Sequence, residues 1–429
     1  MRVNLKTLGC RLNEAELENW AQNFQKNGHQ IVKATDEADL VVLNTCAVTG
    51  EAVRKSRQSI RRIHRGNPKA KLVVSGCYAS LKPEEVAESL GVDLVVLNQN
   101  KDQLVTLAET ELDLKSMPQL STEPGEVALF SRGRQRAFVK VQDGCRYRCT
   151  FCIVTHARGE ERSRPIRDII EEINHLHNQG IQEVILTGVH LGGYGSDLEQ
   201  NLAELVKTIL SETTLPRLRL GSLEPWDLPE DFFQLFKNSR LMPHLHLPLQ
   251  SGSDSVLRRM ARRCKTEEFS QIINEARRVV PNINITTDII VGFPGESEGE
   301  WQESYRFIKQ TGFGHIHIFT YSPREGTKAS TLPNQLTQAV KKERSQKLHQ
   351  LASAMKHAFL GQQVGREEAI LWEGNIDSIG SENATIYGYT PNYTRVSTAT
   401  KNAAKLINSV QIACLDEISA EGGHIESTV

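Results

Sequence analysis

This 429-residue chain contains eight cysteines, and cysteine is the residue type in it that is most suited to metal chemistry. Three of them, Cys145, Cys149 and Cys152, form a tight C-x3-C-x2-C cluster, here called the local triad. Zinc prefers four ligands, usually supplied as two spaced pairs, so three thiolates make an incomplete zinc site. A 4Fe–4S cluster has four irons, and three cysteines leave one iron open to a non-protein ligand. The spacing therefore favours an iron–sulfur cluster, and His156 keeps a Cys3His zinc site open as an alternative.

A second, looser set consists of Cys10, Cys46 and Cys77, here called the distributed triad, and each member follows a run of residues typical of a strand. Strands are expected at 3–8, 40–44, 72–75 and 93–97, with helices at 13–26, 51–64 and 83–90. Alternating strands and helices predict a parallel α/β sheet, in which all strands present their carboxyl ends at one edge. We therefore expect the three thiols to converge, and three unrelated buried thiols are the less favoured interpretation.

The local triad lies in a second run of alternating elements. Strands are expected at 137–141, 183–189, 217–223, 244–249, 285–292 and 315–321, and helices at 166–178, 201–210, 229–238, 253–262, 266–279 and 297–310. Six such units predict a full or partial β/α barrel, whose active site is built from the loops that follow the strands. The local triad comes directly after the first of these strands.

The remaining segments suggest how the chain is divided. The polar stretch 112–135 contains several prolines and glycines and is expected to be a linker. A long polar helix is expected at about 335–360, and short β-type runs separated by Gly and Asn follow, as in a small all-β barrel. We predict an α/β protein with an N-terminal domain at 1–125, a barrel domain at 126–360 and a small barrel at 361–429.

Composition and charge exclude several classes of protein. The 51 Lys and Arg nearly balance 52 Asp and Glu, which argues against a uniformly basic nucleic-acid coat. A hydrophobic content of 39% is typical of a globular protein rather than a disordered one. The chain has no apolar run of about 18 residues and no leader of the secretory type, so we expect no membrane association and a cytoplasmic location. Thiols stay reduced there, so the cysteines need a reason other than disulfides.

The local triad, with the aromatic Phe151 directly before its third cysteine, resembles the radical S-adenosylmethionine (SAM) signature. The whole chain is similar to a narrower family, the radical-SAM methylthiotransferases, which combine a three-cysteine domain, a radical-SAM barrel and a C-terminal TRAM domain. The stretches that carry the resemblance are TLGCRLNEAE (7–16), NTCAVTGEAVRKSRQ (44–58), SGCYA (75–79), VQDGCRYRCTFCIVTHARGEERSR (141–164), LTGVHLGGYG (186–195), HLPLQSGSDSVLRRM (246–260), TDIIVGFPGES (287–297) and YSPREGT (321–327).

The resemblance implies that the local triad holds a 4Fe–4S cluster that cleaves SAM to a 5′-deoxyadenosyl radical. It implies that the distributed triad holds an auxiliary 4Fe–4S cluster, and that the enzyme methylthiolates carbon 2 of an adenine in tRNA. That C–H bond is not acidic, so a general base has little to remove, and radical abstraction is a physically sensible route. The stretches VHLGGYG (189–195) and RLGSLEP (219–225) are most similar to the branch acting on N6-threonylcarbamoyladenosine at position 37 of tRNA.

The resemblance also implies partners and leaves alternatives. The implied partners are tRNA, an electron-donor protein such as flavodoxin or ferredoxin, and a sulfur source, with no membrane. Related enzymes act on isopentenyladenosine in tRNA or on an aspartate of a ribosomal protein, and both substrates stay open. An alternative of a different class is a non-catalytic, metal-stabilised RNA-binding module.

Further SAM contacts are expected around the local triad and at the ends of the barrel strands. By the resemblance, Phe151 packs on the adenine of SAM. Four residues lie at or just after the ends of predicted strands, in positions that face the ligand side of the barrel: Gly188, Ser222, Glu224 and Gln250. A solvated loop acid is an equal interpretation of Glu224. Two nearby histidines, His190 and His246, are read as structural.

Basic side chains beside both triads are candidates for RNA contact. Arg54, Arg57 and Arg61 fall on one face of the helix expected at 51–64, where they could neutralise phosphates. Three more arginines bracket the local triad: Arg146, Arg148 and Arg158. A solvated helix face is the usual alternative for such a run.

The C-terminal segment departs from the family pattern. Residues 361–429 hold four Lys or Arg and nine Asp or Glu, and such an acidic domain should bind RNA poorly. Its aromatic residues either stack on bases or fill a core or interface: Trp372, Tyr387, Tyr389 and Tyr393. The two remaining cysteines, Cys264 and Cys414, are read as structural, although the arginines before Cys264 leave a reactive thiol there as an alternative.

Overall fold

A computed structural model describes residues 1–112, 135–378 and 384–428, so the expected linker lies outside the described residues except at its two ends. The described residues form two compact units. The first contains 1–112, 142–162 and 324–327, and the second contains 135–141, 163–323 and 328–428. Within the described ranges, no helix is both long enough and apolar enough to cross a lipid bilayer.

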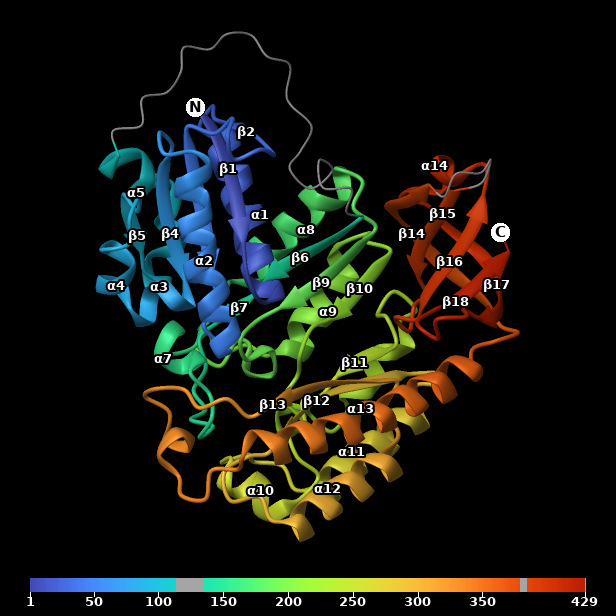
Figure 1. The fold of residues 1–429 in the computed structure, drawn as a ribbon. Coiled ribbons are helices and arrows are strands. Elements are labelled where there is room, and N and C mark those ends of the chain that lie inside the picture. The colour runs from blue at the N-terminus through green and yellow to red at the C-terminus, as the bar shows by residue number, and fades with distance from the viewer. Residues whose placement is uncertain (113–134, 379–383, 429) are drawn as a thin grey trace. The chain divides into compact units, whose positions relative to one another are not determined.

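The first unit is built on a five-stranded parallel sheet in the order β2-β1-β3-β4-β5 (Figure 1). Its strands are β1 (Arg2–Thr7), β2 (Gln30–Ile31), β3 (Leu40–Thr45), β4 (Lys71–Gly76) and β5 (Leu94–Val96). The connecting helices are α1 (Arg11–Lys26), α2 (Gly50–Gly66), α3 (Cys77–Leu81), α4 (Pro83–Ala87), the 3-10 turn η1 (Asn98–Gln103) and α5 (Leu104–Glu111). The predicted α/β sheet is confirmed.

Side chains alternate between the two faces of this sheet, so each face has its own core. On β3, Leu40 and Val42 pack with Trp20 of α1 and residues of α5. The neighbouring Val41 and Leu43 pack with Ile60 of α2 and residues of α3 and α4 on the opposite face. A central strand covered on both sides reads as a continuous apolar run, as β3 does.

The local triad lies in the first unit, on a segment flanked by β7 (Gln142–Asp143) and β8 (Arg162–Ser163). Two residues after its last cysteine, the short helix α7 (Val154–Arg158) begins. Ala157 of α7 belongs to the apolar core that lies under α2, α3 and α4. The cysteine segment is therefore packed onto the N-terminal sheet.

The second unit contains two three-stranded parallel sheets, β10-β9-β6 and β11-β12-β13. Single bridges between Leu218 and Leu241 and between Ser222 and His246 join β10 to the β11 side. The strands are β6 (Arg136–Lys140), β9 (Glu183–Thr187), β10 (Arg217–Leu220), β11 (His244–His246), β12 (Asn284–Val291) and β13 (His315–Thr320). Six parallel strands joined in this order confirm a partial β/α barrel.

Helices connect the strands of the partial barrel (Figure 1). They are α8 (Ile166–Asn178), α9 (Leu202–Glu212), α10 (Asp254–Arg259), α11 (Thr266–Val279), α12 (Glu298–Thr311) and the long α13 (Gln338–Gly361), with 3-10 turns η2 (Leu191–Gly193), η3 (Pro225–Asp227), η4 (Phe232–Lys237) and η5 (Lys328–Thr331). The α-helix expected at 229–238 is wrong, because only η4 forms there. Pro229 and the polar Asn238 bound a segment that suits a short 3-10 connector better than an α-helix.

The C-terminal part of the second unit is a closed barrel in the order β14-β15-β16-β18-β17. Its elements are β14 (Glu367–Ser378), β15 (Ala384–Tyr389), β16 (Arg395–Thr400), α14 (Ala403–Leu406), β17 (Val410–Ile418) and β18 (Ile425–Thr428). Ile370, Trp372, Ile386 and Leu415 fill its core. The small all-β barrel expected for this region is confirmed.

Candidate metal centres

The distributed triad lies at the carboxyl ends of three adjacent strands. In the sheet register Thr7 of β1 pairs with Asn44 of β3, which pairs with Ser75 of β4. Cys10 caps the start of α1, Cys46 follows β3 directly, and Cys77 is the first residue of α3. The three cysteines therefore reach one edge of the sheet together, as the strand pattern predicted.

Two glycines allow these loops to approach closely. Gly9 has a φ of +104°, and a Cβ placed there would lie 2.6 Å from the Cβ and 2.7 Å from the Sγ of Cys46. Gly76 has a φ of +102°, and its Cβ would collide with the backbone oxygen of Thr45. Only glycine accepts both the positive φ and the lack of space. The glycine before Cys10 thus lets the Cys10 loop lie against Cys46.

The thiols of the distributed triad share one environment. Burial raises the pKa of Cys46 to about 11, and the thiols of Cys77 and Cys10 raise that pKa further. Burial also raises the pKa of Cys10, and the charge of Arg158 opposes this rise. An amide donor, Nδ2 of Asn98, lies 3.9 Å from the Sγ of Cys77. The thiols influence one another because they lie close together, as ligands of one group must.

The local triad is held by backbone contacts around its own loop. The N–H of Cys145 donates to the Gly159 carbonyl at 3.1 Å, and the N–H of Cys152 donates to the Cys149 carbonyl at 3.0 Å. The N–H of Val154 donates to the Sγ of Cys152 at 3.4 Å. All three cysteines are partly exposed. Donation of an N–H to sulfur stabilises a thiolate, the form in which cysteine binds metal.

The segment that carries the local triad contacts the edge of the N-terminal sheet at which the distributed triad lies. The side chain of Asn98, which follows β5, donates to the Ala157 carbonyl of α7 at 2.7 Å, and the same amide group faces Cys77. Arg158, the last residue of α7, donates to the Oδ1 of Asn13 at 2.8 Å, and that oxygen lies 3.8 Å from the Cys10 Sγ. Contacts from the segment that carries the local triad thus reach two cysteines of the distributed triad.

The thiols fit an iron–sulfur cluster better than a zinc ion. Among the described residues, neither triad has its three sulfur atoms all within 4.8 Å of one another. A single zinc ion with Zn–S bonds of about 2.3 Å would need its sulfurs closer than that. His156, the proposed fourth zinc ligand, is exposed and belongs to no group of His, Cys and carboxylate ligands in the described residues. Neither triad, in the described residues, therefore has the close sulfur spacing of a single-zinc site.

Sequence reasoning missed the polar residues that support these cysteines. Asn13 and Glu16 lie one turn apart on α1, and Lys101 comes from η1. Ser56 of α2 accepts from the N–H of Cys46 at 3.3 Å and donates to the Cys46 carbonyl at 3.0 Å. The usable signal was present in the motif around Cys10, because a helix that begins at this cysteine must point Asn13 and Glu16 to one face.

The assignment of Arg158 to RNA binding needs correction. Its side chain is only 1% exposed and forms ion pairs with Glu16 at 2.8 Å and Asp143 at 2.9 Å. A guanidinium enclosed by two carboxylates has no free surface for a phosphate. A charge run in sequence cannot distinguish this buried arginine from its exposed neighbours.

The other five arginines proposed for RNA contact are exposed, but they differ in their partners. Arg57 of α2 pairs with Glu85 at 2.5 Å. Arg148 pairs with Glu160 at 2.6 Å, and Arg146 lies 3.7 Å from Glu161. The remaining two, Arg54 and Arg61, are exposed on α2, and no ion pair involves either within the described ranges. Their role in RNA binding stays a prediction.

The strand ends of the partial barrel gather charged side chains. His190 and Asp227 form a 2.6 Å contact between Nε2 and Oδ2, and Glu224 lies 3.8 Å from the same nitrogen. Glu224 is 15% exposed, and burial raises the pKa of its carboxyl group. Asp227 was not foreseen, and its position follows from the turn η3 after β10. A buried acid at a strand end is a feature of ligand sites rather than of solvated loops.

The other residues proposed for SAM contact occupy strand ends or the cysteine loop. Gly188 directly follows β9, and Ser222 bridges His246 just after β10. Gln250 is buried and has a φ of +76°, a conformation that favours glycine. Phe151 lies partly buried within the local triad. Their contacts to SAM stay predictions.

The cysteines and aromatic residues outside the triads are structural in the second unit. Burial raises the pKa of Cys264 to about 12, which disfavours a reactive thiolate. Cys414 lies on β17 of the closed barrel, and its hydrogen bond to Asp416 raises its pKa. Trp372 is fully buried in the barrel core. The rings of Tyr389 and Tyr393 stack on each other with their centres 4.8 Å apart, as expected for residues of a core or interface.

Arginines enclose most of the barrel tyrosines. The guanidinium of Arg136 lies 4.4 Å from the Tyr389 ring centre, and that of Arg219 lies 4.6 Å from the Tyr393 ring centre. Tyr387 stacks on Arg395 at 4.2 Å. The interpretation of these aromatics as core or interface is confirmed for Trp372, Tyr389 and Tyr393.

Comparison with protein families places both triads in known domains. Residues 2–97 match the model of Uncharacterized protein family UPF0004, and residues 139–308 match the Radical SAM superfamily. The chain is 36% identical to the threonylcarbamoyladenosine tRNA methylthiotransferase MtaB of Bacillus subtilis, over 92% of this chain and 89% of that protein. The chain belongs to the radical-SAM methylthiotransferase family. Membership of the radical-SAM superfamily implies SAM and a 4Fe–4S cluster.

Other relatives and one solved structure agree with this family. MtaB of Thermotoga maritima is 37% identical and covers 86% of each chain. The tRNA-2-methylthio-N(6)-dimethylallyladenosine synthase of Oceanobacillus iheyensis is 32% identical, over 99% of this chain and 84% of that protein. The radical SAM methyltransferase TsrM of Kitasatospora setae superposes with a TM-score of 0.59 at 15% identity, covering 77% of this chain and 75% of that one. At that identity the superposition shows the fold alone.

Proposed function

We propose that this methylthiotransferase family member converts N6-threonylcarbamoyladenosine at position 37 of tRNA to its 2-methylthio derivative. Five relatives with 33–37% identity carry the name threonylcarbamoyladenosine tRNA methylthiotransferase, and each matches at least 86% of this chain. A tRNA substrate places the reaction in the cytoplasm. An electron-donor protein, such as flavodoxin or ferredoxin, and a sulfur source complete the set of partners.

The six triad cysteines are the proposed metal ligands. Cys145, Cys149 and Cys152 would hold the 4Fe–4S cluster that, when bound, supplies the electron for cleavage of SAM to a 5′-deoxyadenosyl radical. The distributed triad would hold a second, auxiliary 4Fe–4S cluster. Five residues are proposed to contact SAM: Phe151, Gly188, Ser222, Glu224 and Gln250. The domain limits 1–125, 126–360 and 361–429 are likewise proposed, although residues 142–162 pack with the first unit.

One observation carries this proposal. The three cysteines of the distributed triad, spread over 68 positions of sequence from Cys10 to Cys77, meet at the carboxyl ends of β1, β3 and β4. The segment with the local triad packs onto the same edge through α7. A radical-SAM protein that only cleaves SAM needs one triad. A second triad beside it is what a sulfur-inserting enzyme requires.

The substrate is tested by mass spectrometry of tRNA nucleosides from cells that lack this gene. We expect 2-methylthio-N6-threonylcarbamoyladenosine to disappear and its unmodified precursor to accumulate. A plasmid copy of the wild-type gene should restore the nucleoside, and a Cys46→Ala copy should not. An unchanged nucleoside profile would overturn the tRNA substrate and would favour an aspartate of a ribosomal protein.

Dimethylallyladenosine in tRNA is the second candidate substrate, because three synthases for its methylthio derivative are 31–35% identical to this chain. Purified holoenzyme incubated with each of the two tRNA substrates separates the candidates. We expect methylthiolation only of the tRNA that carries threonylcarbamoyladenosine. Activity confined to the dimethylallyl substrate would reverse the assignment.

The remaining alternative, a non-catalytic RNA-binding module, is separated by metal analysis. Anaerobic reconstitution with iron and sulfide should give about eight irons per chain, as expected for two cubane clusters. Zinc in place of iron, with no cleavage of SAM, would leave only the binding module.

A further inference from the structure

Four charged side chains are buried together near the distributed triad. Glu16 of α1 contacts Lys101 at 2.5 Å and Arg158 at 2.8 Å, and Arg158 also contacts Asp143 at 2.9 Å. The side chains of Glu16, Lys101, Arg158 and Asp143 are 2%, 2%, 1% and 7% exposed. These four residues are here called the buried charge network. Its two carboxylates and two cations balance one another.

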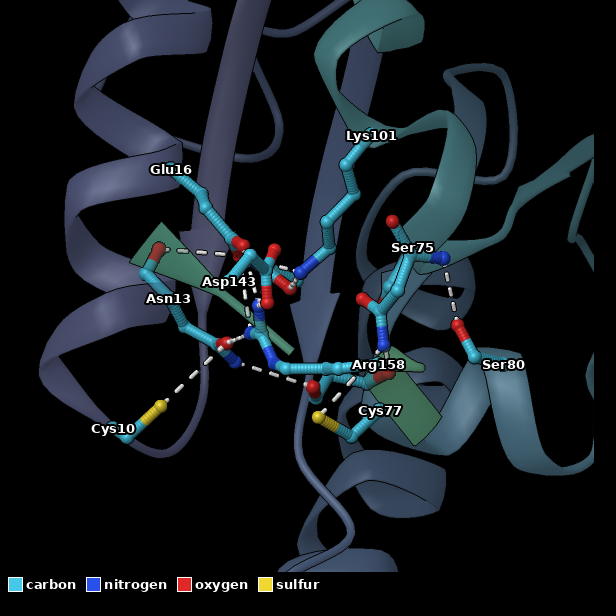
Figure 2. Close-up of polar contacts among 12 residues, drawn as sticks. Cys10, Asn13, Glu16, Ser75, Cys77, Ser80, Lys101, Asp143 and Arg158 are labelled. Atoms are coloured by element: carbon cyan, nitrogen blue, oxygen red, sulfur yellow. Dashed lines mark hydrogen bonds and ion pairs between the residues drawn. The ribbon is translucent and has the colours of Figure 1, made fainter. Parts of the chain in front are cut away.

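The network contacts the loops of both triads. Figure 2 shows the Arg158 guanidinium close to Glu16, Asp143 and Asn13, with the sulfur atoms of Cys10 and Cys77 below it in the view. Asp143 precedes the local triad by two positions and accepts from the N–H of Gly144 at 2.8 Å. Arg158 follows the same triad on α7. The arginine is therefore fixed by groups on both sides of the cysteine segment.

Stability alone gives a weak reason for this network. Burial of charged groups costs several kcal/mol each, and well-packed apolar residues often replace a buried ion pair without loss of stability. Arg158 lies near the thiols, because its guanidinium donates to the Oδ1 of Asn13 at 2.8 Å and that oxygen lies 3.8 Å from the Cys10 Sγ. At such separations, in a buried site, a fixed positive charge acts on any negative charge carried by the sulfurs. Arg158 and the distributed triad are thus electrostatically coupled.

Three thiolates together carry more negative charge than an oxidised 4Fe–4S core carries positive charge. One-electron reduction adds a further negative charge, which a fixed cation nearby stabilises and a fixed carboxylate opposes. Hydrogen bonds, charge and solvent exposure are the ordinary means by which proteins set the reduction potential of such clusters. The network provides both signs of charge in a site from which water is excluded.

We propose that Arg158, held in place by Glu16 and Asp143, is a positioning residue that raises the reduction potential of the cluster bound by the distributed triad. Lys101 occupies one carboxylate oxygen of Glu16 and so prevents Glu16 from cancelling the Arg158 charge completely. This inference rests on the proposed function, because it requires an auxiliary cluster.

The test uses the full-length chain with Cys145, Cys149 and Cys152 all changed to Ala, so that only the distributed triad binds a cluster. After reconstitution with iron and sulfide, the cluster is reduced by one electron with dithionite and redox mediators, and electron paramagnetic resonance follows the reduced form. The parent protein should hold about four irons. The variants added to it are Arg158→Met, Arg158→Lys and Glu16→Gln, with Arg2→Met as the control. Arg2 is also an ion-paired arginine of the first unit, but its side chain is 50% exposed.

The decisive result is whether each variant raises or lowers the reduction potential of the cluster. Arg158→Met should lower the ratio of reduced to oxidised cluster at least tenfold at a fixed ambient potential, which corresponds to about 59 mV for one electron. Glu16→Gln removes a negative charge and should shift the potential upward. Arg158→Lys keeps the charge and should restore most of the parent value, and Arg2→Met should leave it unchanged.

Structural disruption alone would give a different pattern. Loss of packing would move Arg158→Met and Glu16→Gln in the same direction, and it would not spare Arg158→Lys. Either outcome, or the absence of any shift, overturns the inference while leaving the auxiliary cluster in place. If Arg158→Met binds no iron, the upward shift in Glu16→Gln decides the question by itself. A parent protein without iron would instead refute the auxiliary cluster of the proposed function, and the inference with it.

Discussion

The two triads are assembled in different ways. The local triad holds three cysteines within one loop, which backbone hydrogen bonds close from Cys145 to Gly159. The distributed triad takes one cysteine from the end of each of three strands, so its geometry depends on the register of β1, β3 and β4. The first arrangement is specified by a few neighbouring residues. The second exists only when the whole N-terminal sheet is folded.

This difference has a consequence for how each site fails. A change in the sheet or in the packing of its loops should disturb the distributed triad and leave the local triad intact. A change in the local loop should have the reverse effect. The two triads also differ in exposure, because Cys46 and Cys77 are buried and Cys10 is exposed, whereas all three members of the local triad are partly exposed. The following predictions test whether the two sites separate in this way.

The largest expected effect comes from removing one cysteine of each triad. Cys149→Ala should reduce the cleavage of SAM to background, because the cluster that supplies the electron loses a ligand. Cys46→Ala should keep the cleavage of SAM close to the wild-type rate but abolish methylthiolation. Chromatography of 5′-deoxyadenosine measures the first activity, and mass spectrometry of the tRNA measures the second.

Cys264→Ala is the matched control, because Cys264 is a buried cysteine outside both triads. It should leave both activities in place. Methylthiolation by Cys46→Ala at the wild-type rate would contradict the division of labour between the triads.

The local triad could be identified from sequence because its spacing is itself the signal. The distributed triad needed one more step, namely the expectation that parallel strands end at one edge, and the register of β1, β3 and β4 confirms that step. The buried partners could not be foreseen in the same way. Asp143 contacts Arg158, and Lys101 contacts Glu16. The members of each pair are far apart in sequence, and no local pattern encodes either pairing.

The second prediction concerns the glycine that brings Cys10 close to Cys46. Gly9→Ala places a methyl group 2.7 Å from the Cys46 Sγ and also imposes a positive φ on a non-glycine residue, at a cost of about 1–3 kcal/mol. We expect iron to fall from about eight to about four per chain, with the cleavage of SAM retained. Iron and sulfide analysis of the reconstituted protein measures the change.

Gly28→Ala separates the contact from the backbone strain. Gly28 also has a positive φ, +82°, but nothing lies within 4 Å of the position of its Cβ. This variant should keep about eight irons. Equal loss of iron in both variants would show that backbone strain, rather than the close approach to Cys46, determines whether the distributed triad binds iron.

A smaller effect is expected at the strand ends of the partial barrel, where Glu224 lies near His190 and Asp227. Burial raises the pKa of Glu224, so the folded state binds its proton more tightly than the unfolded state. The stability gained from this group is complete below its unfolded pKa and is lost as the pH rises through its folded pKa. At neutral pH the ionised carboxylate therefore destabilises the fold.

Glu224→Gln removes that ionisation. The variant should be more stable than wild type by about 1 kcal/mol at pH 8, and the difference should vanish at acidic pH, where Glu224 is protonated. Denaturant unfolding of the two proteins without clusters, across this pH range, measures the difference. A stability difference that does not change with pH would show that Glu224 has the same pKa in the folded and unfolded states, which would contradict this prediction.

The smallest expected effect separates the arginines beside the two triads. Arg54 and Arg61 on α2 have no ion-pair partner within the described residues, whereas Arg146 and Arg148 face Glu161 and Glu160.

A phosphate must displace Glu161 or Glu160 before it can bind Arg146 or Arg148. These two arginines should therefore contribute less to the affinity for tRNA. Each free phosphate contact contributes about 0.7–0.9 to the slope of log affinity against log salt.

The double variant Arg54→Ala/Arg61→Ala should therefore reduce this slope by about 1.4–1.8, and Arg146→Ala/Arg148→Ala by less than about 1. Filter binding of tRNA across a salt series measures both slopes. A larger loss in the second pair would place the stronger tRNA contact beside the local triad, and equal slopes in all proteins would remove both arginine pairs from the tRNA interface.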